Sequence, residues 1–422
     1  MIRRLLRQAA GLFARHRTGR HGAARLALVA GVLLLALAAG ALAANNSVTG
    51  QKKEEGGFQT AAPTAILIDA ETGTVLYEKA ADTPTAPSSL AKLMTAEVVF
   101  NEIVAGRLTL DQEFMVSEDA WRRGGAPSHT SSMFAPIHSK VRVEDLLRGL
   151  IIQSGNDAAI ALAEGIAGNE RNFATQMTKR ARELGLTRST FGNATGLSDP
   201  ANAVTMRELA RLAQHIIKTY PQFFPIYGER EFTWNKIRQL NRNPLLPLNI
   251  GADGMKTGFT AEGGYGLVGT ALQNGLRLIV AINGLKTAKE RADEGKRLLD
   301  WGFSGFEARP LFAEGQAIGD AKVYGGDRGS VPLVADRAVS VLVPKNTTDR
   351  ISARIVYTGP VPAPVQQGQA IGRLRVIRGE NVTLEVPLKA AEAVERGTLP
   401  QRAIDVVTEL FIGLVRAGVA RI

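Results

Sequence analysis

The spacing of apolar and polar residues divides the chain into a mixed first part and a strand-rich second part. Apolar, β-favouring runs at 65–69 and 74–77 flank Glu71-Thr72-Gly73, which predicts a hairpin. Helical apolar spacing predicts helices at 90–103, 144–150, 157–166, 173–184 and 206–219. Strand patterns return at 265–271 and 276–282, before a helix at 292–301. A sheet whose first and later strands enclose an all-helical block predicts an α+β fold.

The second part begins near Glu307. From there to Ala390, short Val/Ile/Leu-rich runs at 339–343, 351–357, 373–377 and 382–388 are broken by Gly and Pro. This pattern predicts a smaller all-β domain, a sandwich or barrel. We therefore expect domains at 61–306 and 307–390 and a linker at 391–402, and an amphipathic helix at 403–422, where Ile404, Val407, Phe411, Leu414 and Val415 share one face.

The amino terminus has the pattern of a secretory signal over residues 1–43. Seven arginines and no acidic residue occupy the first 25 positions, a 15-residue apolar run follows from Leu26 to Gly40, and Ala41-Leu42-Ala43 is a small-x-small cleavage pattern. A retained membrane anchor is the alternative, because the uncharged stretch to Asn45 approaches the roughly 20 residues that a span needs. Either interpretation predicts export, followed by a flexible leader at 44–60.

Charge and cysteine content narrow the function classes. The net charge is +11, from 51 Lys and Arg against 40 Asp and Glu, but seven of these positive charges lie in the first 25 residues. The remaining +4 predicts no nucleic-acid partner. The absence of cysteine excludes disulfides, iron–sulfur clusters, cysteine zinc sites and a thiol nucleophile, and we expect neither metal nor cofactor.

Three short motifs stand in order in the first domain: Ser89-Leu90-Ala91-Lys92, Ser154-Gly155-Asn156 and Lys256-Thr257-Gly258. They match S-x-x-K, S-x-N and K-T-G, the signature set of penicillin-binding proteins and serine β-lactamases. S-x-x-K alone is uninformative because ordinary residue usage produces it by chance. The set is specific, because the serine falls at a predicted helix start, the second motif in a turn between helices and the third just before a strand.

The first motif suits nucleophilic catalysis. A serine hydroxyl needs a base, and Lys92 lies one helical turn from Ser89 on the same face. Lysine acts as a base only when its pKa is depressed, for which burial and the like charge of Lys256 are candidates. The backbone N–H of Ser89, with a second from the strand beginning near Phe259, would stabilise an oxyanion.

The second motif suits proton relay and substrate binding. Ser154 could pass a proton to a leaving amine, and the Asn156 amide could hold a substrate amide group. Taken singly, Lys92 is better explained as a solvated helix lysine and Lys256 as a surface lysine, and the alternative for Ser154-Gly155-Asn156 is ordinary turn chemistry.

With these motifs the exported chain resembles the low-molecular-weight penicillin-binding proteins that are D-alanyl-D-alanine carboxypeptidases, the S11 serine peptidases. The further runs that resemble the family lie at 150–157 (LIIQSGND), 241–243 (NRN), 253–258 (DGMKTG) and 298–303 (LLDWGF). The resemblance implies a penicillin-binding-protein/serine β-lactamase-like transpeptidase fold, an antiparallel sheet plus a helical insert. It also implies a C-terminal β domain and a membrane-binding helix at the end.

The resemblance also assigns roles. It implies that Ser89 is acylated, that Lys92 is its base, and that Ser154 and Asn156 form the second-motif pair. It places the substrate carboxylate against the K-T-G segment, at Lys256, Thr257, Gly258 and Phe259, and against Arg291, although Arg291 could equally be a surface arginine in the charged stretch 286–297. Phe259 stands where relatives often have histidine, and the loop 196–200 lacks the histidine common before its Gly-Leu.

The partners implied by the resemblance are a peptidoglycan stem pentapeptide, which loses its terminal D-alanine, and β-lactam antibiotics as covalent inhibitors. The implied location is the periplasm, with peripheral attachment to the outer face of the inner membrane.

Two other functions remain alternatives. A class A β-lactamase shares the motifs, but no E-x-x-L-N stands between Asn156 and Lys256, and the extra β domain disfavours it. A non-catalytic peptidoglycan-binding envelope protein would be expected to have lost Ser89, Lys92 or Lys256. Labelling with a fluorescent penicillin separates the three, because the scaffold takes no label, the lactamase releases it quickly and the carboxypeptidase retains it.

Overall fold

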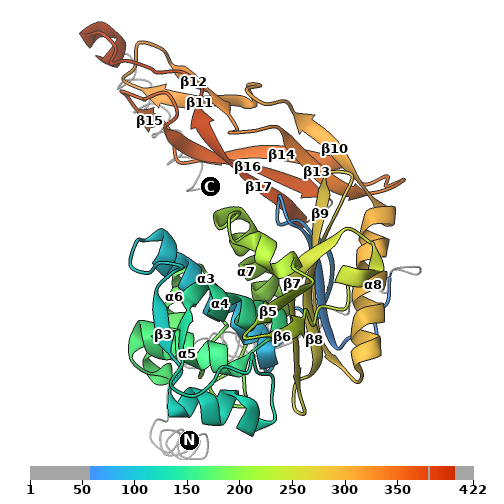
Figure 1. The fold of residues 1–422 in the computed structure, drawn as a ribbon. Helices are drawn as coiled ribbons and strands as arrows, with labels where there is room; N and C mark the ends of the chain where they lie inside the picture. Colours follow the sequence, from blue (N-terminus) through green and yellow to red (C-terminus); the bar gives the residue numbers. More distant parts are fainter. Residues whose placement is uncertain (1–57, 379–380, 404–422) are drawn as a thin grey trace, which may run out of the picture. The chain divides into compact units, whose positions relative to one another are not determined.

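The computed structural model describes residues 58–378 and 381–403, and the first domain in that range is built on a five-stranded antiparallel sheet. Its order is β2-β1-β9-β8-β7 (Figure 1). The bounds are β1 Thr64–Asp69, β2 Val75–Lys79, β7 Ala252–Thr260, β8 Gly264–Gln273 and β9 Leu276–Leu285. The predicted hairpin at 65–77 is confirmed as β1 and β2, and the predicted strands at 265–271 and 276–282 as β8 and β9. Strand β7 is at the edge of the sheet.

The third motif lies within β7, so its predicted place just before a strand is wrong. Strand β7 begins at Ala252, four residues before Lys256, and pairs with β8 from Ala252 to Thr260. Two glycines, a buried lysine and a threonine interrupt the apolar pattern there, which concealed the strand.

The described residues of this domain form six α-helices: α3 Lys92–Val104, α4 Val143–Arg148, α5 Asn156–Ala167, α6 Glu170–Glu183, α7 Met206–Thr219 and α8 Ala288–Gly305. Helix α7 packs on one face of the sheet, with the other helices of the block beyond it, and α8 packs on the opposite face. Alternate residues of β1 enter two separate cores, as the period of two in a strand requires. Ile66 and Ile68 pack with the helical block, and Leu67 packs with Leu298 and Leu299 of α8. The sheet is therefore the middle layer of three.

The sequence predicted an all-helical block between β2 and β7, and this prediction is wrong. The block contains two short antiparallel strand pairs, β3 Glu113–Met115 with β4 Lys140–Arg142, and β5 Glu231–Trp234 with β6 Ile237–Leu240. Strands this short give too few alternations to be distinguished from loops. The block also contains single helical turns: η1 Ser88–Ala91, η2 Ala120–Gly124, η3 Ala126–Ser128, η4 Gly149–Gln153, η5 Phe224–Gly228 and η6 Leu246–Leu248.

The second part of the chain is an all-β domain with its own apolar core. Strands β10 Phe306–Phe312 and β13 Val339–Pro344 pair, and a further sheet has the order β14-β16-β17-β12-β11-β15. The bounds in that sheet are β11 Gly319–Tyr324, β12 Ser330–Val334, β14 Ile351–Tyr357, β15 Val361–Pro362, β16 Ala370–Arg378 and β17 Asn381–Ala390. The four predicted strands correspond to β13, β14, β16 and β17.

The segment 391–402 is not a free linker over its first half. Val394 is buried in the β-domain core and exchanges two backbone hydrogen bonds of 2.9 Å with Val365. The predicted signal at 1–43, most of the leader and nearly all of the terminal helix lie outside the described residues. Within 58–378 and 381–403, no helix is both long and apolar enough to cross a membrane.

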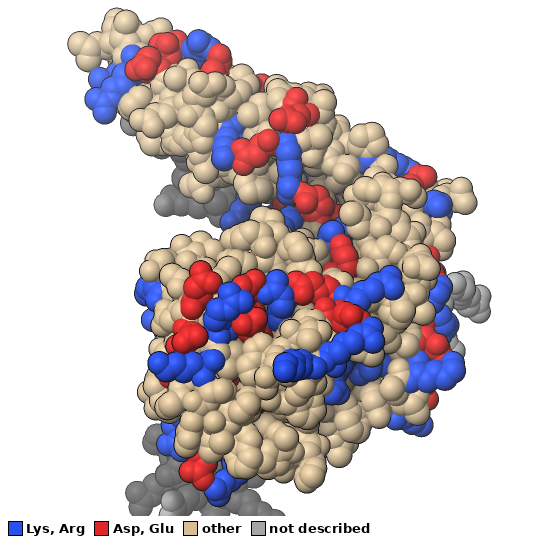
Figure 2. Space-filling model, in the orientation of Figure 1, with Lys and Arg blue, Asp and Glu red and all other residues tan. Residues whose placement is uncertain are grey.

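Acidic and basic side chains are interleaved over the face shown in Figure 2. Among the described residues, some ion pairs join side chains one helical turn apart, such as Arg122–Glu118 and Arg148–Glu144. Exposed pairs of this kind contribute little to stability, roughly 0–1 kcal/mol each.

Candidate active site

The first motif spans the junction between a 3-10 turn and a helix. Ser89 lies in η1, and the α-helix proper begins at Lys92, slightly later than the sequence predicts. Ser88, with φ of 45°, makes the sharp entry into this turn. The arrangement leaves Ser89 partly accessible and places its Oγ 3.0 Å from the Lys92 Nζ.

Lys92 is buried, 1% exposed, and its amine has three oxygen neighbours. Besides Ser89 Oγ, these are the Asn156 Oδ1 and the backbone carbonyl of Thr195, each 2.7 Å from Nζ. The last two oxygens can only accept hydrogen bonds, whereas the serine hydroxyl can also donate. A neutral amine matches this set, because it has two N–H donors for the two acceptors and one lone pair for the hydroxyl proton.

The environment lowers the pKa of Lys92 to about 7. Burial is the main cause, and the positive charge of Arg242 adds to it, while Asp157 and Glu170 act in the opposite direction. Lys256, the like charge that the sequence suggested, interacts electrostatically with Lys92, and Arg242 is a second positive charge near it. Burial, and then the charge of Lys92, hold the pKa of Lys256 itself well below its usual value.

The second motif connects a helical turn to α5. Ser154 adopts a left-handed backbone conformation with φ of 65°, and α5 begins at Asn156. The Asn156 side chain bridges two elements, since its Oδ1 accepts from Lys92 and its Nδ2 donates to Thr130 Oγ1 at 2.9 Å. The Ser154 hydroxyl is buried and has no hydrogen-bond partner among the described residues. Its hydrogen-bonding capacity is therefore available to a bound substrate.

Asp157 is a structural member of the site to which the sequence analysis gave no role. Its fully buried carboxylate accepts hydrogen bonds from Ser132 Oγ and from the backbone N–H groups of Met133 and Ala135. Burial raises the pKa of Asp157, and these bonds counteract that rise. Asp157 thus fixes the segment at 131–135 beside Asn156. The sequence signal that could have pointed to Asp157 was its position directly after the S-x-N motif.

The third motif forms one wall of the site. Lys256 is buried, with Nζ 3.0 Å from the Thr257 carbonyl. Gly258 is required by close packing, because a Cβ there would lie 2.3 Å from Ser88 Oγ and 3.2 Å from the Leu90 nitrogen. The K-T-G strand is thereby held against the turn that carries Ser89.

Two aromatic rings and an arginine lie beyond the glycine. Phe259 is 53% exposed and its ring centroid lies 4.2 Å from that of Tyr265. The Arg291 guanidinium lies 5.5 Å from the Tyr265 ring centroid, with Nη1 3.5 Å from the Gly258 carbonyl. Arg291 is therefore beside the K-T-G strand rather than an isolated surface residue.

Arg242 is a further cation that the sequence reasoning noted in a motif but left without a role. It lies close enough to Lys92, Lys256 and Arg291 to lower the pKa of each, and burial lowers its own. In the described chain none of these four side chains forms a salt bridge with a carboxylate. The positive charge of Arg242 and Arg291 is therefore uncompensated and favours an anionic group of the substrate.

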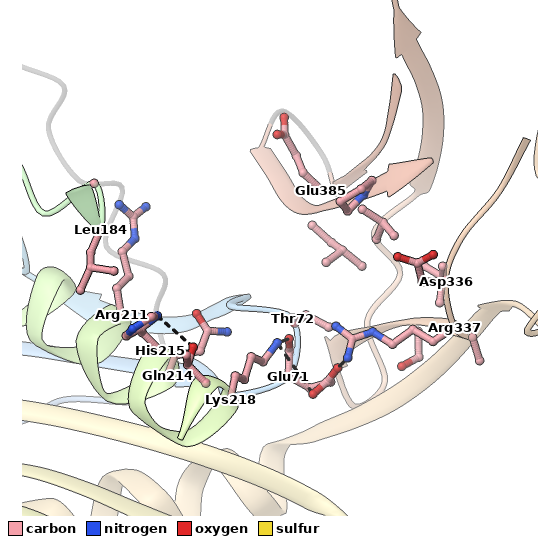
Figure 3. Close-up of a pocket in the computed structure, with 18 residues that line it drawn as sticks. Glu71, Thr72, Leu184, Arg211, Gln214, His215, Lys218, Asp336, Arg337 and Glu385 are labelled. Carbon is pink, nitrogen blue, oxygen red and sulfur yellow. Dashed lines mark hydrogen bonds and ion pairs between the residues drawn. The ribbon is translucent and has the colours of Figure 1, made fainter. Parts of the chain in front are cut away.

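A separate cavity of about 950 Å³ lies away from these motifs. Figure 3 shows its lining, which includes Arg211, His215 and Lys218 of α7, and the Glu71–Arg337 ion pair. No residue of the three motifs lines this cavity.

In the described ranges, no group of three or more His, Cys, Asp or Glu side chains is arranged to hold a metal ion.

A buried, partly desolvated lysine beside an accessible serine, in a three-layer fold with S-x-x-K, S-x-N and K-T-G, defines a serine acyl-transferring enzyme of the penicillin-binding type. The chain matches the D-alanyl-D-alanine carboxypeptidase family, peptidase S11, over residues 48–287, and a C-terminal domain of penicillin-binding protein 5 over residues 306–396. The chain belongs to peptidase family S11, and it is a D-alanyl-D-alanine carboxypeptidase.

Individual relatives agree with this assignment. The chain is 40% identical over 350 residues to D-alanyl-D-alanine carboxypeptidase DacC of Escherichia coli (strain K12), covering 82% of this chain and 87% of that protein. Penicillin binding protein 5 from Haemophilus influenzae superposes with a TM-score of 0.72 at 36% identity, covering 81% of this chain and 99% of that one. Penicillin-Binding Protein D2 from Listeria monocytogenes, in its ampicillin-bound form, has a TM-score of 0.53 at 30% identity, covering 58% and 99%. These similarities favour the carboxypeptidase over a β-lactamase or a non-catalytic scaffold.

Proposed function

We propose that the enzyme removes the terminal D-alanine from peptidoglycan stem pentapeptides through an acyl-enzyme on Ser89. The observation that carries this proposal is the set of contacts around Lys92. Its amine touches two pure acceptors and one hydroxyl, with a pKa near 7, which suits a base that takes the Ser89 proton.

The reaction proceeds in two halves. Ser89 Oγ bonds to the carbonyl carbon between the two terminal D-alanines, and its proton passes to Lys92 Nζ. Backbone N–H groups of Ser89 and Phe259 stabilise the resulting oxyanion. The C–N bond then breaks, the leaving amine receives the proton held by Lys92, relayed through Ser154, and free D-alanine departs. Water next attacks the ester carbonyl carbon and gives a proton to Lys92. The bond between that carbon and Ser89 Oγ breaks, the proton passes from Lys92 to Ser89 Oγ, and the shortened peptide leaves with a new terminal carboxylate.

The free carboxylate of the substrate determines where the enzyme cuts. We assign its binding to Thr257 and the cations Lys256, Arg291 and Arg242, because charge-assisted hydrogen bonds to a carboxylate are the strong ones. Asn156 is placed to hold a substrate amide. The outward edge of β7, with Gly258 and Phe259, offers backbone groups to the extended peptide, since no described strand pairs with it.

Two further features complete the proposal. β-Lactams acylate Ser89, as the ampicillin-bound relative suggests by analogy.

Residues 1–43 direct export to the periplasm, and the segment 403–422 holds the enzyme on the outer face of the inner membrane. Four charges in that segment, Asp405, Glu409, Arg416 and Arg421, disfavour a span and favour a helix in the plane of the interface.

The covalent step is tested by Ser89→Ala, with Ser304→Ala on the exposed face of α8 as the control. We expect Ser89→Ala to lose penicillin labelling and at least about a thousandfold in D-alanine release from a pentapeptide, while circular dichroism stays unchanged. The control should retain both. Normal D-alanine release by Ser89→Ala would refute the assignment of the nucleophile.

The base is tested by pH. Because neutral Lys92 is the active form, kcat/KM should rise with pH through an acid limb centred near 7 and level off above it. Lys92→Arg cannot deprotonate and should lose acylation while remaining folded. If this variant is acylated at the wild-type rate, the base is another group.

Carboxylate recognition is tested with a pentapeptide whose terminal carboxylate is amidated. The wild type should prefer the free acid by about 100-fold, the value of one strong charged hydrogen bond. Arg291→Ala should narrow this preference to about tenfold, and Lys289→Ala, an exposed residue on the same helix, should leave it intact. If Arg291→Ala keeps the wild-type preference for the free acid over the amide, Arg291 does not bind the substrate carboxylate.

Membrane attachment is tested by deleting residues 403–422. The truncated enzyme should move from the membrane to the soluble fraction and still hydrolyse a soluble peptide. Full-length enzyme should stay bound in high salt, because apolar burial dominates the attachment. Sedimentation of the truncated enzyme with membranes would place the anchor elsewhere.

A further inference from the structure

The backbone carbonyl that accepts a hydrogen bond from Lys92 belongs to a segment 103 positions further along the chain. This segment, 193–196, makes no regular strand or helix. Internal hydrogen bonds shape it, since Asn193 Oδ1 accepts from the N–H groups of Thr195 and Gly196 at 3.2 and 2.7 Å. These bonds set its curvature, but they do not attach it to the rest of the domain.

Two side chains attach it. From α3, Thr95 Oγ1 donates to the Ala194 carbonyl at 2.7 Å. From the first turn of α6, Glu170 Oε1 accepts from the Ala194 N–H at 3.0 Å. Both hydrogen bonds are made to Ala194, the residue directly before Thr195. The position of the Thr195 carbonyl relative to Lys92 therefore depends on Glu170.

Glu170 also acts on Lys92 by charge. Its side chain is only 11% exposed, burial raises its pKa, and its carboxylate raises the pKa of Lys92. In a partly buried setting such interactions are only weakly screened. This effect opposes the desolvation that lowers the pKa of Lys92.

We propose that Glu170 is a positioning residue for Lys92: it fixes the Thr195 carbonyl against the lysine amine and places a negative charge behind it. The inference rests on the proposed role of Lys92 as the base. In this arrangement the carboxylate keeps the lysine basic enough to take the serine proton, despite its burial near Arg242 and Lys256.

The charged groups around both residues are defined. Lys92 is faced by Asp157 of α5, Glu170 of α6, Arg242 after β6 and Lys256 of β7. Glu170 is faced by Arg123, with which it forms an ion pair, by Asp119 of the same region, by Glu164 of α5 and by Lys92. Removing the Glu170 charge takes a negative charge away from Lys92 and leaves Arg123 paired only with Asp119. Both changes make the local potential at Lys92 more positive.

Glu170→Gln separates the two parts of the proposal, because an amide oxygen can still accept from the Ala194 N–H. The matched control is Glu164→Gln. Glu164 lines the same surface hollow of about 830 Å³ and also has a pKa raised by burial, but no described hydrogen bond joins it to residues 193–196. Glu170→Ala removes both the charge and the bond.

The experiment measures the second-order rate of acylation by a penicillin, and kcat/KM for a pentapeptide, between pH 5 and 9. In Glu170→Gln the acid limb should move to lower pH by about 0.5 to 1 unit, since removing a nearby negative charge makes Lys92 easier to deprotonate. Glu170→Ala should show this shift and also a lower plateau. Glu164→Gln should keep the wild-type limb.

Each outcome has one meaning. A folded Glu170→Gln variant with an unmoved limb overturns the inference while leaving the base assignment intact. An equal shift in Glu164→Gln overturns it as well, because the effect would then not be specific to Glu170. A wild-type enzyme without a limb near pH 7 would instead refute the proposed role of Lys92.

Discussion

The rest of the site depends on a buried lysine, Lys92, whose amine no carboxylate of the described residues contacts directly. Burying an ammonium is costly unless the charge is compensated, and proteins respond by favouring the neutral form. Here the three neighbours of the amine are an amide oxygen, a backbone carbonyl and the serine hydroxyl. The same three contacts therefore hold the lysine in place and favour its neutral form, which is the form that the proposed mechanism requires.

The remainder of the domain maintains that burial. The η1 turn brings Ser89 to the lysine, β7 closes one side through Gly258, and the segment 193–196 closes another. Asp157 secures the segment that supports Asn156. Because interiors are close-packed, small displacements in any of these elements change the distance between Ser89 and Lys92.

The sequence predicted the parts of the site that local spacing encodes. Ser89 and Lys92 are one turn apart, so a helical pattern alone places them together. The parts formed by long-range contacts were not predictable in this way. Arg242, Glu170 and the Thr195 carbonyl reach Lys92 from elements far along the chain. The run 241–243 resembles the family but does not indicate what Arg242 contacts, and nothing in the local sequence of Glu170 or Thr195 indicates a catalytic setting. The K-T-G strand was misplaced for a related reason, since its close packing requires the glycine that obscures its strand pattern.

The titration of Lys92 tests the central claim most directly. Enzyme labelled with ¹³C at the lysine ε-carbons can be followed by NMR as a function of pH, with the Lys92 signal assigned by its loss in Lys92→Arg. The account predicts a midpoint near 7, far below the usual value of about 10.4 for lysine. A midpoint above 10 would show that the amine is protonated throughout the working range, and Lys92 could not be the base.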